Sequence, residues 1–100
     1  RIMFDTFHAN IEEKNTSEAM KQIADLTPHV QISESTRGIL GEGQVNIPKF
    51  LNTLNDLNYD GWIVVESFGT KLPAAHIWRK MFNNERELIE KSYQYLKEIN

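Results

Sequence analysis

The chain alternates short apolar segments with amphipathic stretches three times, and this order limits the folds open to it. The apolar segments cover residues 2–4, 29–33 and 61–66. Apolar residues at helical spacing follow each one, at residues 17–26, after residue 46 and from residue 85 onward. Strands that alternate with helices in this way predict βαβ units on a parallel sheet, with right-handed crossovers that cover one face. The predicted fold class is therefore α/β.

Each of the three predicted helices follows an asparagine that can cap it. Asn15 and Asn84 are followed three residues later by glutamate, which is the capping-box spacing, and Asn46 is followed by a proline in the first turn. The segment between the first strand and Asn15 is predicted to be a polar loop. A further short helix is expected in the third loop, and it would carry Ala75, Ile77 and Trp78.

Charge and composition exclude several classes of partner. The formal charge of −3 offers no basic stripe that would neutralise phosphates, so we expect no nucleic-acid partner. The longest apolar run has four residues, far below the roughly 20 that a membrane helix needs, so we expect no membrane partner. The chain has no cysteine, which is compatible with a reducing compartment and favours a cytoplasmic location. Chemistry on a small molecule fits these properties best.

Three strand-helix units are too few for a closed barrel. A barrel of eight such units takes about 250 residues, whereas this chain has 100 residues and starts without methionine inside a predicted strand. An open three-stranded sheet would leave strand edges and apolar flanks uncovered. We therefore expect residues 1–100 to be one portion of a larger barrel domain, or copies of the chain to associate.

Polar side chains gather where the three predicted strands end. Asp5, Gln31 and Glu66 stand at corresponding places on successive strands, and His8 and Arg37 follow in the adjoining loops. Ligands of parallel α/β proteins bind at the carboxyl ends of the strands, where these loops meet. Carboxylate and amide oxygens are the ligands that hard divalent cations prefer. The pattern predicts a cation site formed by Asp5, Gln31 and Glu66.

Most of these residues also have an ordinary structural explanation. An aspartate after a strand is commonly a turn or cap residue, and His8 alone is a weak signal. Arg37, in a loop that contains glycines, fits a solvated side chain equally well. Glu66 is more informative because it follows four apolar residues, and a buried carboxylate is costly unless a metal or a hydrogen-bond network receives it.

Four segments, in the same order, resemble the D-tagatose and D-psicose 3-epimerase family. They are residues 5–13 (DTFHANIEE), the loop 33–43 (SESTRG followed by two glycines), residues 59–62 (YDGW) and residues 65–68 (VESF). The resemblance covers essentially the whole chain. It implies that the three strands are the sixth, seventh and eighth of a (β/α)8 TIM barrel, and that about five units precede them.

The resemblance also implies a divalent metal, Mn²⁺ or Mg²⁺, with Co²⁺ possible. In this family the metal is held by Glu, Asp, His and Glu, one from each of the last four strands. Asp5 matches the aspartate, and Glu66 matches the last glutamate, which also acts as the acid/base. The first glutamate has no counterpart, because its strand would precede Arg1.

Gln31 departs from the family pattern, since it stands where the epimerases have the histidine ligand. The segment 29–32 (HVQI) is similar to a segment of hydroxypyruvate isomerases in which the glutamine is a metal ligand, so Gln31 stays in the predicted metal set. His8 and Arg37 match the histidine and arginine with which the epimerases bind substrate.

The resemblance implies a fragment of a metal-dependent ketose 3-epimerase that acts on a small ketose by proton abstraction through an enediolate. Such an enzyme would form a homo-oligomer, and we expect the 100-residue chain alone to be inactive. A hydroxypyruvate isomerase or another aldose-ketose isomerase is the nearest alternative, supported by Gln31 and opposed by the segments 5–10 and 33–38. A catalytically silent half-barrel is the alternative from another class.

Overall fold

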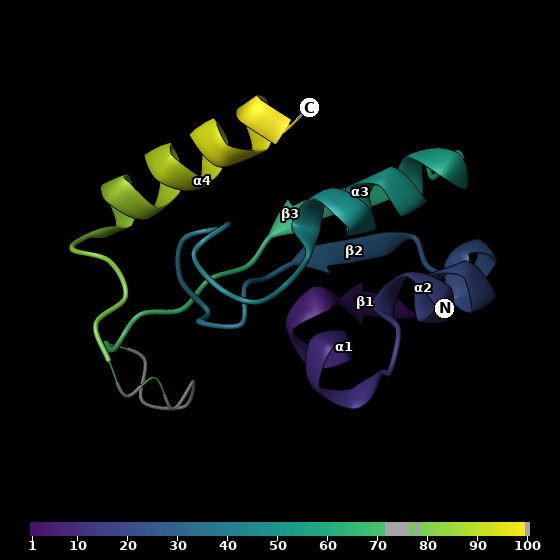
Figure 1. The fold of residues 1–100 in the computed structure, drawn as a ribbon, viewed down its shortest axis with the longest axis horizontal. Coiled ribbons are helices and arrows are strands. Elements are labelled where there is room, and N and C mark those ends of the chain that lie inside the picture. The colour runs from purple at the N-terminus through teal and green to yellow at the C-terminus, as the bar shows by residue number, and fades with distance from the viewer. Residues whose placement is uncertain (72–76, 78, 100) are drawn as a thin grey trace.

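The computed structural model describes residues 1–71, 77 and 79–99. Within these residues the three predicted strands and the helix predicted after each occur in the expected order, with one additional helix after the first strand (Figure 1). The elements are β1 (Met3–Asp5), α1 (Thr6–Glu12), α2 (Thr16–Ile23) with a 3₁₀ turn at Ala24–Leu26, β2 (His29–Ile32), α3 (Ile47–Asp56), β3 (Trp62–Val65) and α4 (Glu85–Ile99).

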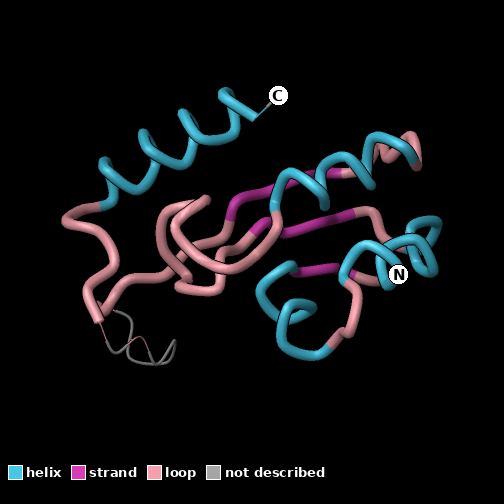
Figure 2. The backbone as a smooth tube through the Cα atoms, in the orientation of Figure 1, coloured by secondary structure: helices cyan, strands magenta, loops and turns pink. Residues whose placement is uncertain are grey.

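The three strands form one parallel sheet in the order β1-β2-β3, which confirms the α/β class (Figure 2). Asp5 pairs with Gln31, and Gln31 in turn pairs with Val64. The sequence predicted that Asp5, Gln31 and Glu66 occupy corresponding places on the three strands. Glu66 instead lies two residues beyond the register position that Asp5 and Gln31 share. The Glu66 backbone N–H donates to the carbonyl of Ile32 at 3.0 Å, which extends the parallel pairing to Glu66.

One face of the sheet is packed against helices. Alternate strand residues Phe4, Val30 and Ile32 are buried there, together with Met20 of α2 and Phe50 of α3. The rings of Phe4 and Phe50 stack with their centroids 5.4 Å apart. Full burial of a side chain of this size contributes about 1.5–3 kcal/mol, so this interface between sheet and helices is the main source of stability.

The opposite face of the sheet changes character along the strands. Met3 and Trp62 stand near the amino ends and are 58% and 75% exposed, whereas Asp5 and Gln31 stand at the carboxyl ends of β1 and β2. Because side chains of a strand alternate between faces and paired residues of parallel strands share one, these residues lie on the same face. The polar end of this face is the end toward which the loops after β2 and β3 extend (Figure 1).

The predicted helix caps are confirmed. The side-chain oxygens of Asn15, Asn46 and Asn84 accept hydrogen bonds from backbone N–H groups three residues later, at 3.1, 3.2 and 2.9 Å. These bonds satisfy N–H groups that have no partner within the helix. Local sequence thus determines where α2, α3 and α4 begin.

Three expectations differ from the structure or fall outside it. The predicted polar loop after β1 contains α1, a helix without a clear apolar stripe, in which only Thr6 and Ala9 are buried. The predicted buried strand, β3, is exposed along its whole length, unlike the edge strand β1, whose Phe4 is covered by α3. Of the expected short helix, Ala75 and Trp78 lie outside the described residues, and Ile77 is not helical.

In the described part of the chain, no helix combines the length and apolar character that crossing a bilayer requires.

The exposed strand β3 leads to a prediction about the isolated chain. The 100-residue polypeptide should self-associate, because β3 offers both an unpaired edge and exposed apolar side chains to another copy. Replacing Trp62 and Val64 together by lysine should shift the chain toward monomer. Sedimentation velocity over a range of concentrations measures this, and an unmodified chain that stays monomeric throughout and melts cooperatively would show that β3 needs no cover.

Candidate functional site

Asp5 ends β1 and at the same time caps α1. Its Oδ1 accepts hydrogen bonds from the backbone N–H groups of Phe7 at 2.7 Å and His8 at 3.4 Å. Its other oxygen, Oδ2, faces the guanidinium of Arg37 at 3.8 Å. The side chain is buried, and the cap fixes its orientation, so the second oxygen is held toward the space beyond the strand ends.

Arg37 brings the strand ends together. Its Nη1 lies 3.8 Å from Asp5 Oδ2 and 3.3 Å from Glu66 Oε1, and it donates to Ser33 Oγ at 3.0 Å. The two carboxylate oxygens can be no farther apart than the sum of the first two distances. The Arg37, Asp5 and Glu66 side chains are 12%, 7% and 21% exposed, so solvent screens these charges only weakly.

Two aromatic rings flank the guanidinium, and the sequence reasoning did not assign them a role. The Arg37 Cζ lies 3.8 Å from the centre of the Phe7 ring and 4.9 Å from that of Phe68, both within cation–π range. Each phenylalanine follows a strand-end carboxylate by two residues. That shared spacing is the signal from which they could have been found.

The backbone of Arg37 is held in a left-handed conformation, with φ of 62°. For a residue with a side chain this conformation costs about 1–3 kcal/mol and needs support from its surroundings. Arg37 N–H donates to the carbonyl of Glu34 at 2.9 Å, and the Arg37 carbonyl accepts from Phe68 N–H at 2.8 Å. The loops after β2 and β3 therefore hold Arg37 between them.

Hydrogen bonds also join the loop after β2 to the start of α1. Thr6 Oγ1 donates to the carbonyl of Ser33 and accepts from the Ser33 N–H, both at 2.8 Å and fully buried. Since Thr6 adjoins Asp5 and Ser33 contacts Arg37, this pair of bonds sets the spacing between the carboxylate and the guanidinium.

The other two predicted site residues, Gln31 and His8, form no side-chain hydrogen bond or ion pair with Arg37 in the described structure. Gln31 is half-buried and shares a face with Asp5, its partner in the strand register. His8 lies in the first turn of α1, where its ring contacts the Phe7 ring edge-on at 5.1 Å and is otherwise exposed. The structure thus unites Asp5, Arg37 and Glu66 by direct contacts and places Gln31 beside Asp5.

The chemistry of the site fits a divalent cation. Asp5, Gln31 and Glu66 offer two carboxylates and an amide oxygen, which are the donors that Mg²⁺ and Mn²⁺ prefer. In this structure the guanidinium of Arg37 lies against both carboxylates and partly balances their negative charge. Among the described residues, no three His, Asp or Glu side chains cluster closely enough to hold a metal by themselves.

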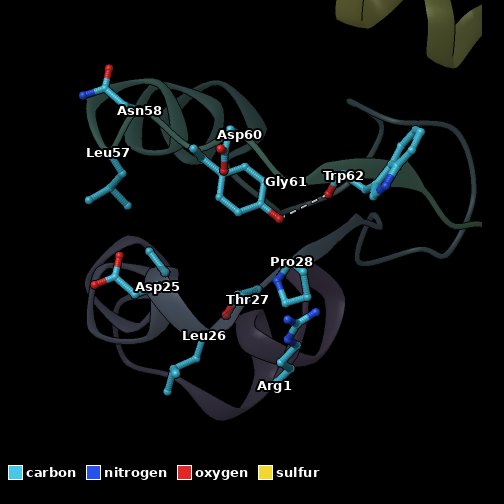
Figure 3. A pocket seen from close by; sticks show the side chains of 12 residues that line it. Arg1, Asp25, Leu26, Thr27, Pro28, Leu57, Asn58, Asp60, Gly61 and Trp62 are labelled. Atoms are coloured by element: carbon cyan, nitrogen blue, oxygen red, sulfur yellow. Dashed lines mark hydrogen bonds between the residues drawn. The ribbon is translucent and has the colours of Figure 1, made fainter.

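A cleft of about 550 Å³ lies at the other end of the sheet (Figure 3). It is lined by residues that precede the strands, including Arg1 before β1, Pro28 before β2 and Gly61 before β3. The Tyr59 hydroxyl donates to the carbonyl of Trp62 at 3.4 Å across this region (Figure 3). Active sites of parallel α/β barrels lie at the carboxyl ends of the strands, so the candidate site is at Arg37 and not in this cleft.

Comparison with known proteins assigns the chain to a family. Residues 1–99 match the model of the xylose isomerase-like TIM barrel family, and the chain belongs to it. It is 37% identical over 93 residues to a ketose 3-epimerase of Arthrobacter globiformis, covering 87% of this chain and 32% of that protein. It is 36% identical over 85 residues to a D-psicose 3-epimerase of Enterocloster bolteae, covering 81% of this chain and 28% of that protein.

Solved structures agree with this assignment. A D-allulose 3-epimerase from Methylomonas sp., solved with D-allulose, superposes with a TM-score of 0.88 at 30% identity, covering 99% of this chain and 36% of that one. An L-ribulose 3-epimerase superposes with the same TM-score of 0.88 at 27% identity, covering 97% and 35%. The chain thus has a TIM-barrel-like α/β fold and spans about a third of the length of the curated relatives it matches.

Removing Arg37 should destabilise the metal-free protein. Arg37→Ala would leave the carboxylates of Asp5 and Glu66 facing each other without a cation, and loss of one partner of a buried ion pair costs about 3–5 kcal/mol. Urea unfolding of the full-length protein in the presence of a chelator measures the effect. Arg86→Ala, which removes an exposed ion pair of α4 with Glu90, is the matched control and should change stability very little. Equal effects of the two substitutions would contradict the central place given to Arg37.

Proposed function

We propose that the full-length protein that carries this chain is a divalent-metal-dependent ketose 3-epimerase, and that these residues form strands six to eight of its barrel. The observation that carries the proposal is the contact of Arg37 with Asp5 and Glu66, carboxylates that end two strands of one parallel sheet. Relatives named ketose and D-psicose 3-epimerases support the reaction type. The proposal includes a homo-oligomeric enzyme in the cytoplasm, with a small ketose as substrate.

Asp5, Gln31 and Glu66 would hold Mn²⁺ or Mg²⁺, and Co²⁺ would satisfy the same donors. When bound, the cation would polarise the ketose carbonyl and so acidify the hydrogen on C3. The oxygen donors stand at the carboxyl ends of the strands, with Asp5 oriented by its cap on α1. This orientation is set before any ligand arrives, which reduces the cost of binding.

Glu66 is the proposed base, and its Oε1 would take the proton from C3. Arg37 Nη1, which lies 3.3 Å from that oxygen, orients the carboxylate and would stabilise negative charge that develops on the neighbouring substrate oxygen. His8, exposed beside Phe7, would hold a further hydroxyl of the sugar. Inversion at C3 needs a second carboxylate on the opposite face, which we assign to the part of the enzyme outside these residues. The 100-residue chain alone is therefore proposed to be inactive.

Two observations support alternative reactions, which the experiment must distinguish from 3-epimerisation. Gln31, in place of the histidine expected of an epimerase, favours an aldose-ketose isomerase as the second candidate function. The chain is also 35% identical over 66 residues to a 3-dehydro-D-guloside 4-epimerase of Escherichia coli, covering 66% of this chain and 25% of that protein. Analysis of the products by NMR separates the three, because each reaction exchanges or inverts a different carbon.

The test of the proposed function is solvent deuterium incorporation at C3 of a ketose by the full-length protein. Glu66→Gln keeps the shape and one oxygen donor but removes the base, so exchange should fall by about 10²- to 10⁴-fold. Mn²⁺ affinity, measured by the electron paramagnetic resonance of the free ion, should weaken only moderately because one oxygen ligand remains.

Glu85→Gln is the control, since Glu85 is exposed in the first turn of α4, and it should leave exchange unchanged. Near-normal exchange at C3 by the Glu66→Gln protein with Mn²⁺ bound would reduce Glu66 to a structural ligand. The two-carboxylate mechanism would then have to be abandoned.

A further inference from the structure

A third carboxylate, that of Glu34, is fully buried in the loop after β2 and has no part in the proposed reaction. Its Oε1 accepts hydrogen bonds from the backbone N–H groups of Ser35 at 2.8 Å and Val45 at 3.0 Å. Its Oε2 accepts from the N–H of Gly41 at 3.0 Å. No basic side chain forms an ion pair with it in the described structure, so these three backbone donors compensate for the burial of its charge.

The loop between β2 and α3 is shaped around this carboxylate. A Cβ at Gly43 would collide with Ser35 Oγ and would lie 2.5 Å from Glu34 Oε1, so only glycine allows the loop to come this close. Gly41 has φ of +89° and lies against the ring of Tyr95 on α4. Burial, and after it the negative charge of Glu34, raises the pKa of the Tyr95 phenol. Glu34 is therefore the internal acceptor around which residues 35–45 fold.

Arg37 stands in the first turn of this loop. Its N–H donates to the Glu34 carbonyl at 2.9 Å, and its own carbonyl accepts from Phe68 N–H at 2.8 Å. The next carbonyl, that of Gly38, accepts from Ser67 Oγ at 3.1 Å. A displacement of Glu34 would thus move the backbone of Arg37 and loosen its contacts with the loop after β3.

We propose that Glu34 is a positioning residue that acts through Arg37. Its carboxylate accepts hydrogen bonds from the N–H groups of Ser35, Gly41 and Val45 and so fixes the shape of the loop. This loop shape keeps Arg37 in the left-handed conformation, which places its guanidinium beside Asp5 and Glu66. Glu34 touches neither reacting atoms nor the proposed metal ligands by its side chain. The kinetic consequence rests on the proposed function, whereas the structural consequence does not.

The structural consequence is tested by amide hydrogen exchange on the full-length protein. In Glu34→Gln one carboxylate oxygen is replaced by an NH₂ group, which cannot accept a hydrogen bond from a backbone N–H. At least one of the three bonds is therefore lost. Exchange at Gly41 or Val45 should quicken by about tenfold, the scale of one hydrogen bond to a charged acceptor. Exchange at Phe68 should also quicken, because its N–H reports the position of Arg37. Glu42→Gln, an exposed carboxylate of the same loop, is the matched control and should change none of them.

The kinetic consequence is tested by a double-mutant cycle. Glu34→Gln should raise KM for the ketose by about 10- to 100-fold, because small misplacements of a substrate-binding group carry losses up to about 10²-fold. A general loss of folded protein would instead lower the apparent kcat and leave KM unchanged. On an Arg37→Ala background, Glu34→Gln should raise KM no further, since the residue through which it acts is gone.

Two results would overturn the proposal. One is unchanged amide exchange at Phe68 while Gly41 or Val45 exchanges faster. The other is an equal rise in KM for Glu34→Gln with and without Arg37. If Glu34→Gln does not fold, Gly43→Ala is the second variant, because its Cβ would press on both the Ser35 hydroxyl and the Glu34 carboxylate and would displace that carboxylate while leaving its charge in place. If the unmodified protein does not turn over ketoses, the proposed function fails, and the exchange at Phe68 alone decides the role of Glu34.

Discussion

The guanidinium of Arg37, set between the carboxylates of Asp5 and Glu66, is the contact on which the candidate site depends. Two carboxylates that close together and poorly hydrated repel each other unless a cation lies near both. The structure supplies that cation from the loop after β2, at 3.8 and 3.3 Å, and fixes it between the rings of Phe7 and Phe68. The geometry of three strand ends is thereby tied to one side chain.

The fold separates stability from chemistry by using the two faces of one sheet for different purposes. Phe4, Val30 and Ile32 anchor the sheet on its helices, and none of the three belongs to the candidate site. Leu40 and Val45, of the loop that carries Arg37, join the same cluster. The other face carries the polar groups at its carboxyl end. The positive φ of Arg37 is supported there by two hydrogen bonds, one donated by Arg37 N–H to the Glu34 carbonyl and one donated by Phe68 N–H to the Arg37 carbonyl. Substitutions at the site should therefore leave the helix-covered core in place, although loss of Arg37 also lowers stability because it leaves two carboxylates without a cation.

The sequence alone predicted the order of elements, the helix caps and the end of the sheet that carries the polar residues, because periodicity and capping are local signals. It did not predict α1, since the residues after Asp5 lack an apolar stripe and the helix depends on the cap that Asp5 provides. Nor did it predict the exposure of β3, because an apolar run does not reveal which neighbours cover it. The spacing of Phe7 and Phe68 after the two carboxylates is a local signal, but their contact with Arg37 joins separate loops and cannot be deduced from it. The role of Glu34 depends on how the loop after β2 folds back on itself, which no periodic pattern contains.

In the proposed enzyme, Asp5, Gln31 and Glu66 are the part of a divalent-cation site that this chain contributes. The most direct measurement is the anomalous scattering of Mn²⁺ in crystals of the full-length protein soaked with the ion. The account predicts one strong peak at the carboxyl ends of the strands, within about 2.0–2.6 Å of an oxygen of each of the three side chains. A peak elsewhere, or no peak at saturating Mn²⁺ with Arg37 still in contact with both carboxylates, would contradict it.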